Sequence, residues 1–563
     1  MVRPMGTELL YRPALGWSDL NPGTPTSAAI LKQLARGLNR EAVVKAASIL
    51  NLYLNAIRGQ WDDAKRDQQR AFVKELLPDD LAQRALSHID AGTASAFFFP
   101  EQLLLAARIS SAIGLPGPAR WERALGAEYL LRVSDIIVSG PGDRDALVGM
   151  ILRQLGSQGQ EQERYLMPRY FDIMVTRARK RWASLFDDAF KRRTGLSIEA
   201  YLAGGLFLTA PFVEMRTQQD LERVGFETVF GAAASALEPA YSDTLQRLLV
   251  ADVDSYGAGV DSSDLRHLAL SSFVSILDKP YFPLSNGSAI PLSPRLALER
   301  LSTGIYWEIF SDFARRDPVN GVTALNSMVG ELFQEYSSDA LAKAYEGHPS
   351  AQLVVERDIR GAHKQASSPD GVVVQGGTWV CIEMTVTTLS MKTLVSADAD
   401  AFRAELNDEQ LQKKLRQPVI GAKNLLQGVL THPSLDPATV IDVFPLVLFM
   451  HPFPQHWLIW EEVDRVYRAE QFLWAPSGRR VNVHRLQFIS AEEMEMLEAG
   501  MAIGMNLAEV LRDKERAELQ LSRTSLKNYM FAMGMAREHD NRRLKQLLES
   551  LPEQLKPHLH IKE

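Results

Sequence analysis

The fold is decided by residues 367–386, which read Ser367-Ser368-Pro369-Asp370-Gly371-Val372-Val373-Val374-Gln375-Gly376-Gly377-Thr378-Trp379-Val380-Cys381-Ile382-Glu383-Met384-Thr385-Val386. Two β-rich runs separated by a Gly-Gly pair predict a hairpin with a two-residue turn. Paired residue numbers in such a hairpin have a constant sum, and this places Asp370 opposite Glu383. Like charges that face each other across an antiparallel pair are destabilising. Because a cation between the two carboxylates would remove that repulsion, the stretch predicts a metal site.

The hairpin belongs to a predicted α/β section that covers residues 322–511. In chain order, the expected elements are a helix over 322–345, an extended run over 351–356, the hairpin, a helical region over 399–430, a nearly all-apolar strand over 443–450, a strand over 483–489 and a helix over 491–511. Continuous apolar runs are typical of central strands covered on both faces. This order predicts one mixed α/β domain.

The rest of the chain is predicted to be mainly helical. Residues 1–278 form a large, mainly helical region, in which residues 1–25 look irregular and apolar positions recur at three- and four-residue spacing from about Pro25 to Leu277. Residues 279–321 are a connector, in which Asn286-Gly287 predicts a short hairpin before a helix. Residues 512–563 are a charge-rich helical tail. The expected fold class is therefore α plus α/β, with the helical region first.

The composition limits the classes of function that remain. The formal charge of −7 excludes a uniformly basic nucleic-acid coat, so any such contact needs a local basic patch. One stretch, over residues 177–193, is dense in Arg and Lys, and is read either as a phosphate-tracking surface or as a solvated helix face. A single cysteine indicates a reducing compartment, and neither a secretion leader nor a membrane span is expected. We expect a cytoplasmic protein.

The order of elements and the motif positions resemble the PD-(D/E)XK phosphodiesterase superfamily, which has the restriction-endonuclease-like fold. The resemblance covers residues 322–511. Pro369-Asp370 matches the first half of the motif, and Glu383-Met384-Thr385 matches the second. The helix stretch 330–336 is also similar to the first helix of these enzymes. The resemblance implies Mg²⁺ or Mn²⁺ held by Asp370 and Glu383.

The resemblance also implies further site residues. An acid on the first helix often orders the metal in this superfamily, and the candidates are Glu331 and Glu335. The lysine position of the motif holds Thr385, whose hydroxyl cannot supply the positive charge that helps to activate the attacking water. Several members replace or relocate this lysine. Here the candidates to supply the charge are Lys392 beyond the strand, Lys413 and Lys414 on the following helix, and Lys364 before Asp370.

The alternation of the second strand predicts how the site is presented. Residues 379, 381, 383 and 385 share one face, and residues 380, 382, 384 and 386 share the other. We expect the second set to pack into the core and the first set to face a cleft. Mg²⁺ suits carboxylate ligands and keeps several waters. It would polarise a phosphoryl oxygen for in-line attack by water.

Two functions of different classes follow from the sequence. The first is a metal-dependent nuclease, expected to act on DNA, whose helical region senses or binds a partner, as in prokaryotic antiviral defence effectors. The second is a catalytically inactive nuclease-like protein that serves as an interaction or nucleic-acid-binding subunit. Thr385 favours the second, and the facing carboxylates favour the first. DNA or RNA as the partner, and self-association, are left open.

Overall fold

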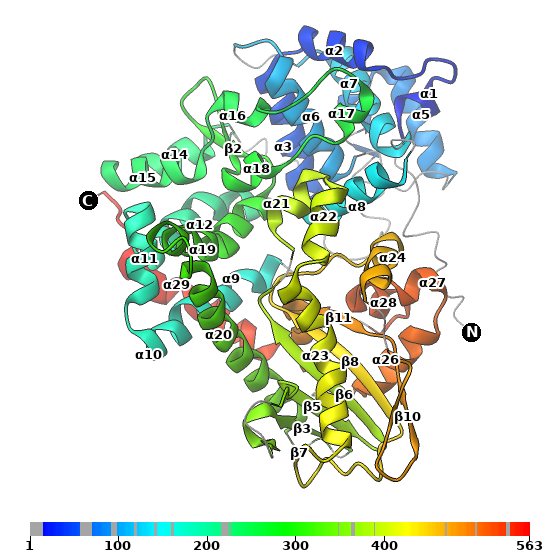
Figure 1. Cartoon of the computed structure of the whole chain (residues 1–563). Coiled ribbons are helices and arrows are strands. Elements are labelled where there is room, and N and C mark those ends of the chain that lie inside the picture. Colours follow the sequence, from blue (N-terminus) through cyan, green and yellow to red (C-terminus); the bar gives the residue numbers. More distant parts are fainter. Residues whose placement is uncertain are drawn as a thin grey trace.

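The structure is a computed structural model of the chain, and it describes residues 15–56, 70–71, 73–91, 98–117, 121–139, 143–158, 163–214, 225, 227–346, 348, 350–361, 366–387, 389–467, 470–501, 504–535 and 541–562. Figure 1 shows helices in the upper and left parts of the view, and a sheet with its own covering helices at the lower right. A helical region combined with a mixed α/β unit is therefore the observed class.

Helices dominate the chain up to residue 278. They are α1 (Trp17–Leu20), α2 (Ala28–Gly37), α3 (Arg40–Ala56), α5 (Asp79–Asp90), α6 (Pro100–Ile113), α7 (Arg123–Ser139), α8 (Arg144–Gln158), α9 (Glu163–Phe171), the π-helix η2 (Asp172–Arg177), α10 (Ala178–Trp182), α11 (Leu185–Thr194), α12 (Ile198–Glu214), α14 (Val229–Ala236), α15 (Pro239–Leu249), α16 (Val253–Gly257), α17 (Leu265–Ala269) and α18 (Val274–Asp278).

The hairpin predicted at Asn286-Gly287 forms next. Its strands are β1 (Tyr281–Pro283) and β2 (Ala289–Pro291), which pair antiparallel. Gly287 has φ = 80°, a conformation that glycine adopts without steric cost. Helices α19 (Pro294–Arg316) and α20 (Gly321–Tyr345) follow and lead to the main sheet.

The main sheet has seven strands and mixes parallel and antiparallel pairs. In chain order, its strands and the helices between them are β3 (Ala351–Val355), β5 (Gly371–Gln375), β6 (Thr378–Thr385), α21 (Met391–Ser396), α22 (Ala399–Leu406), α23 (Glu409–Leu426), β8 (Asp442–Phe449), α24 (Trp457–Val466), β9 (Phe472–Trp474), β10 (Arg480–Val483) and β11 (Gln487–Ser490). The order across the sheet is β3-β5-β6-β8-β10-β9, and β11 also pairs with β8. The short turn η3 (Glu356–Asp358) follows β3, and β4 (Arg360–Gly361) pairs with β7 (Leu430–Thr431) outside this sheet.

Both faces of the central strand β6 are covered. Helix α20 packs on the face that carries Val380 and Ile382, whereas α23 packs on the face that carries Trp379 and Cys381. In Figure 1, α23 lies in front of the sheet and α20 lies to its left. After Asp442 the sequence of β8 is all apolar, which fits its place beside β6, because both faces of this part of the strand are also buried.

The remaining helices close the sheet unit and return to the helical region. They are α25 (Ala491–Met501), α26 (Leu507–Arg516), α27 (Leu519–Ser522), α28 (Leu526–Ala532), α29 (Arg542–Leu555) and the short η4 (Lys556–His558). A capping box begins α25, because the main-chain N–H of Ser490 donates to Glu493 Oε2 and that of Glu493 donates to Ser490 Oγ. Helix α29 packs against α9 and α12, so the end of the chain lies against helices from its first half.

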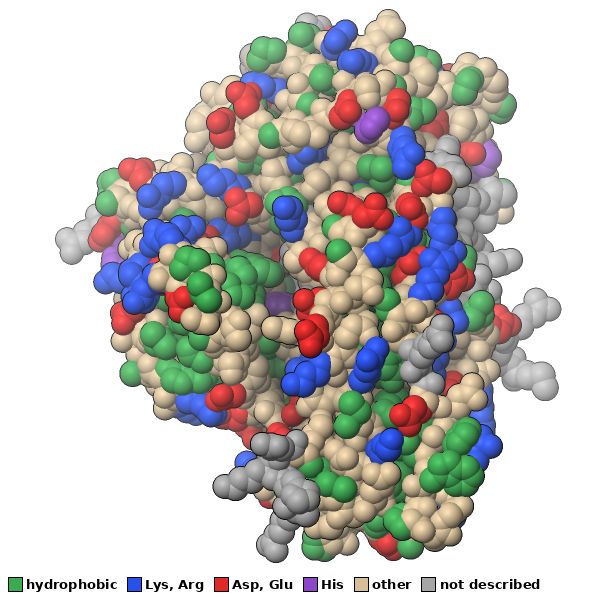
Figure 2. All heavy atoms as spheres, viewed as in Figure 1, with side chains coloured by type: hydrophobic (Ala, Val, Ile, Leu, Met, Phe, Trp, Pro, Cys, Tyr) green, Lys and Arg blue, Asp and Glu red, His purple; other side chains and the backbone are tan. Residues whose placement is uncertain are grey.

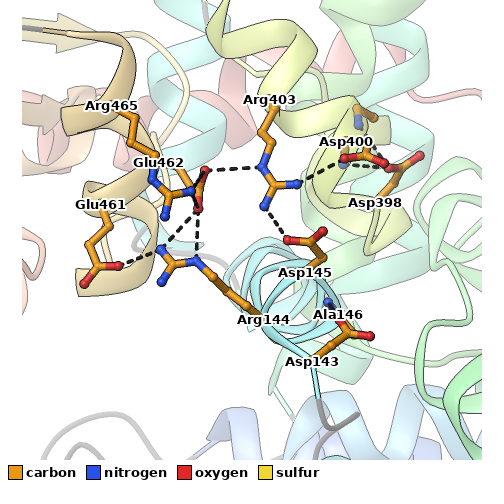
Figure 3. A network of polar contacts seen from close by, with 11 residues as sticks. Asp143, Arg144, Asp145, Ala146, Asp398, Asp400, Arg403, Glu461, Glu462 and Arg465 are labelled. Carbon is orange, nitrogen blue, oxygen red and sulfur yellow. Dashed lines mark hydrogen bonds and ion pairs between the residues drawn. The ribbon is translucent and has the colours of Figure 1, made fainter.

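A polar network joins the helical region to the sheet unit. Figure 3 shows Glu462 of α24 surrounded by Arg144 of α8, Arg403 of α22 and Arg465 of α24. The three arginines lie 3.2, 3.2 and 2.9 Å from the Glu462 carboxylate, whose side chain is only 3% exposed. Arg403 also contacts Asp145 of α8. One buried carboxylate therefore gathers positive charge from both parts of the chain.

Among the described residues, no single helix is long and apolar enough to cross a membrane. Helices α11 and α12 meet the length and composition requirements only as a pair, which is bent by 55°.

Candidate carboxylate–lysine site

The hairpin of β5 and β6 has the predicted register. Gly371 pairs with Ile382 and Gln375 pairs with Thr378 across the Gly376-Gly377 turn. Gly376 has φ = 57°, as the first position of a type II′ turn requires. One step beyond the last pair, Asp370 and Glu383 lie beside each other at the start of β5 and near the end of β6.

Asp370 is held by donors from two directions. Gln334 Nε2, on α20, lies 2.9 Å from Asp370 Oδ1, and the main-chain N–H of Met384 donates to Oδ2 at 2.6 Å. Only 9% of Asp370 is exposed. The carboxylate is therefore fixed in orientation by α20 and by the strand that carries Glu383.

Glu383 is fully buried and has one satisfied and one unsatisfied oxygen. Lys414 Nζ, on α23, lies 2.5 Å from Glu383 Oε1. Glu383 Oε2 has no hydrogen-bond partner among the described residues. Because buried polar atoms are nearly always satisfied, this oxygen has hydrogen-bonding or coordinating capacity left for one further partner, such as a water or a cation.

A third acid, Glu356, lies at the edge of the site. Gln334 Nε2 donates to Glu356 Oε2 at 2.9 Å as well as to Asp370, and the main-chain N–H of Glu356 donates to the carbonyl of Asp370 at 3.0 Å. Unlike the buried pair, Glu356 is exposed. It adds negative charge at the rim without being enclosed.

Burial raises the pKa values of both central acids, and neighbouring negative charge adds to the effect. Burial raises the pKa of Asp370 to about 6, while the N–H of Met384 and the charge of Lys414 partly offset the effect. Burial, and then the neighbouring Asp370, raise the pKa of Glu383 to about 8, again with Lys414 acting in the opposite direction. One lysine therefore does not balance the negative charge that the pair carries when fully ionised.

The position of Lys414 depends on close docking of α23. A Cβ added to Gly421 would lie 2.6 Å from Pro369 Cδ and 2.8 Å from Pro369 N, so only glycine allows this approach. Asn424 Nδ2 also donates to the carbonyl of Ser367 at 2.8 Å. Helix α23 is thus fixed against the segment that leads into Asp370, and this brings Lys414 to Glu383.

The other lysines and the threonine of the motif are placed differently. Thr385 is buried, and its Oγ1 accepts from the N–H of Thr387 at 2.9 Å. Lys392 and Lys413 are exposed, and neither contacts the acid pair in the described part of the chain. Lys364 lies outside the described residues.

The acids proposed from the first helix are engaged elsewhere. Glu331 pairs with Arg181, and Glu335 pairs with Arg177 at 3.0 Å. Both side chains are nearly half exposed, and the residue of α20 that contacts Asp370 is Gln334. The structure therefore brings together Asp370, Glu383 and Lys414, but not Glu335 or Lys392.

The expectation that one face of β6 opens to a cleft is wrong for most of the strand. Trp379 and Cys381 pack against Val419 and Ala422 of α23, and every residue of β6 is buried. The face is covered because α23 returns over the sheet before β8. Only the end of this face, at Glu383, meets polar side chains.

The Arg- and Lys-rich stretch of residues 177–193 is largely neutralised by acids. Its ion pairs join Arg177 to Asp172, Glu335 and Asp339, Arg179 to Asp187 and Glu199, Arg181 to Glu331, Arg192 to Asp312, and Arg193 to Glu308. Of the aromatic rings near this stretch, Tyr170 is fully buried, and Trp182 is partly buried and stacks on Phe186. This stretch is a poor phosphate-binding surface.

The residues present fit a hard divalent cation. Mg²⁺ is usually bound through one or two carboxylates and keeps several waters, which matches two adjacent acids with an unpaired oxygen on Glu383. The described residues contain no group of three or more His, Cys, Asp or Glu side chains arranged to hold a metal. A cation here would thus have Asp370 and Glu383 as its protein ligands, with water completing its coordination.

Sequence reasoning missed two residues of the site. Glu356 follows β3, and the antiparallel pairing of Val355 with Gly371 places it next to Asp370. The pairing register of β3 with β5 would have placed Glu356 beside Asp370. The sequence did not determine this register, because a long connection separates the two strands. Gln334 lay inside the helix stretch already singled out, where only acids were considered.

No protein-family model, no curated protein and no solved structure matches the chain.

Proposed function

We propose that the chain is a metal-dependent phosphodiester hydrolase that cleaves DNA at the Asp370–Glu383 pair. The observation that carries the proposal is the environment of Glu383. One oxygen of this buried carboxylate contacts Lys414. The other has no hydrogen-bond partner among the described residues, and the carboxylate lies next to Asp370. Two acids and one lysine at one point are the set expected for a nuclease of the PD-(D/E)XK type.

The arrangement of the sheet unit supports the same proposal. Helix α20 precedes an antiparallel hairpin, β5 and β6, and β8 then adds parallel to β6 after the helices α21 to α23. This is the order of elements that the resemblance implies for a restriction-endonuclease-like domain. The acids lie at the end of the hairpin where α20 and α23 both reach the sheet.

Asp370 and Glu383 would hold the metal. A bound Mg²⁺ or Mn²⁺ would polarise a phosphoryl oxygen and neutralise charge that develops during cleavage. Binding of a dication would also offset the effects of burial and of neighbouring negative charge that raise the pKa values of the two acids. Metal affinity should therefore increase with pH, because each acid must lose its proton to bind.

The remaining residues would orient the acids and supply charge. Gln334 and the N–H of Met384 fix the Asp370 carboxylate. The Lys414 ammonium lies 2.5 Å from Glu383 Oε1, so it places at the pair the positive charge that Thr385 cannot supply. In this proposal Lys414 takes the role of the motif lysine and stabilises charge on the phosphate being cleaved.

A plasmid-cleavage assay tests the proposal. Wild type is compared with Asp370→Asn and Glu383→Gln in Mg²⁺ and in Mn²⁺, with Asp358→Asn as a matched control for the loss of one exposed acid. We expect wild type and the control to cut, and both site variants to lose at least 100-fold in rate. Equal cutting by all four proteins, or cutting that survives EDTA, would refute it.

One observation favours a second candidate function. Both oxygens of Asp370 already have donors, and Lys414 neutralises part of Glu383, so the acids are held without a metal. A catalytically inactive nuclease-like subunit that binds nucleic acid or protein would have this arrangement. Such a protein shows no thermal stabilisation by Mg²⁺, whereas a metal-binding enzyme is stabilised as occupancy rises.

The helical region is proposed to sense or bind a partner, as in a prokaryotic antiviral defence effector. The Arg144–Glu462 and Arg403–Asp145 contacts of Figure 3 support this, since they join α8 of the helical region to α24 and α22, the helices that follow and precede α23 in the chain. Plating efficiency of phages on a bacterial host that expresses wild type, or Glu383→Gln, tests it. Equal plating on both strains and on an empty-vector strain, over a broad phage panel, would argue against a defence role.

A further inference from the structure

One face of α23, the helix that carries Lys414, has exposed positive charge. Lys413, Arg416 and Lys423 are exposed and follow each other at three- and seven-residue spacing, so they lie along one side of the helix. We define these three residues as the α23 basic face. Ile420, which is 44% exposed, lies between Arg416 and Lys423 on the same side.

The α23 basic face is not neutralised by the described residues. None of its three side chains forms an ion pair with a described carboxylate, and the hydrogen bond of Arg416 is to Gln412 Oε1 at 3.3 Å. The acids at the start of α23 are Asp408, which is the N-cap residue, and Glu409, which is in the first turn. This face therefore differs from the stretch 177–193, whose arginines are paired with acids.

The same helix connects this face to the acid pair. Lys414, next to Lys413, turns inward to Glu383, and Gly421 contacts Pro369 next to Asp370. Figure 2 shows Lys and Arg side chains along the course of α23, below acidic side chains near its start. A ligand that lies along this face would thus bind the helix that also holds Lys414 against Glu383.

The dimensions of the face suit a phosphate backbone. The ten steps from Lys413 to Lys423 span about 15 Å of helix axis. One strand of duplex DNA carries a phosphate about every 3.4 Å of axis, so this length covers about four phosphates. A protein with a net charge of −7 needs such a local stripe to approach DNA at all.

We propose that the α23 basic face binds the phosphate backbone of duplex DNA, on the helix that also carries Lys414 to the Asp370–Glu383 pair. This inference rests on the proposed nuclease function. Lys413, Arg416 and Lys423 position the DNA, whereas Lys414 acts at the acids. Their loss should therefore weaken binding and leave the cleavage step of bound DNA intact.

Fluorescence anisotropy with a labelled 30-base-pair duplex in EDTA tests the inference, because cleavage is then absent. Wild type is compared with Lys413→Gln/Arg416→Gln/Lys423→Gln over a series of salt concentrations. The matched control removes three exposed lysines elsewhere, as Lys180→Gln/Lys191→Gln/Lys556→Gln. Each lost phosphate contact reduces the slope of log K against log salt by about 0.9, so the triple variant should lose about 2.7. The control should keep the wild-type slope.

The outcomes separate the inference from the function on which it rests. If wild type binds and cuts DNA but the triple variant keeps its slope and KM, the inference is wrong and the nuclease proposal stands. If wild type binds no duplex at 50 mM salt, both are wrong. Stronger competition by duplex RNA than by duplex DNA would overturn the choice of DNA. Single variants, each expected to lower the slope by about 0.9, replace the triple variant if it does not fold.

Discussion

The strongest test of the site is the pH dependence of stability after Glu383→Gln. Burial and the neighbouring Asp370 raise the pKa of Glu383 from 4.5 to about 8 in the folded protein. Between these values the folded protein binds a proton that the unfolded chain has released. Stability therefore falls as pH rises through this range, and it is constant below about 4 and above about 9.

The size of the effect follows from the two pKa values. At about 1.36 kcal/mol for each unit of pKa, the free energy of unfolding should fall by about 3–4 kcal/mol between pH 5 and pH 8 because of this one group. Glutamine has nearly the same shape and carries no charge, so the variant should lack this fall. It also keeps an oxygen that can accept from Lys414.

Urea unfolding in EDTA, followed by tryptophan fluorescence at several pH values, measures this difference. The stability of wild type relative to Glu383→Gln should decline by about 3–4 kcal/mol from pH 5 to pH 8, and Mg²⁺ should restore it in wild type alone. Asp358→Asn, which removes an exposed acid, should follow wild type. Curves for wild type and Glu383→Gln that stay parallel within about 1 kcal/mol would show that Glu383 ionises normally and would remove the electrostatic basis of the site.

Three further predictions concern the lysine, the network and the docking of α23. Lys414→Gln should lower the cleavage rate at least 100-fold while Lys392→Gln changes it less than twofold, measured on plasmid DNA; the reverse order would assign the role to Lys392. Glu462→Gln should destabilise the protein by about 2 kcal/mol in urea unfolding, because three arginines lose a buried charged partner. Glu461→Gln, at a more exposed carboxylate, is the control and should destabilise it by less than about 1 kcal/mol. Gly421→Ala should lower the free energy of unfolding by about 1–3 kcal/mol, because the added Cβ would overlap Pro369. It should also slow cleavage, because Lys414 would move away from the acids. An unchanged rate and stability would show that α23 can shift without affecting the site.

The local geometry of the site could be predicted from the sequence because a tight turn determines it. Gly376-Gly377 fixes the register of the hairpin, and this places Asp370 beside Glu383 without any information from the rest of the chain. The strand β8 was predictable for a similar reason, since a long all-apolar run suits only a central position. Such features depend on the turn type and on burial, and the residue types indicate both directly.

The partners of the pair could not be predicted because they depend on how helices dock. Lys414 is 31 residues after Glu383, and it reaches Glu383 only because Gly421 lets α23 approach Pro369. The sequence offered four lysines of equal standing, and spacing alone could not choose among them. Burial of the Trp379 face was missed for the same reason, since the return of α23 over the sheet is a tertiary feature.

The location of the lysine changes what controls the site. A lysine on β6 would be fixed by the strand that carries Glu383, whereas Lys414 is fixed by the contact of α23 with the segment before Asp370. Helix α22, which precedes α23, is held in turn by Arg403 to Asp145 of the helical region. A change in the helical region could therefore alter the distance between Lys414 and Glu383 without moving the acids. A site completed by a helix in this way is suited to control by the part of the chain that we propose as the sensor.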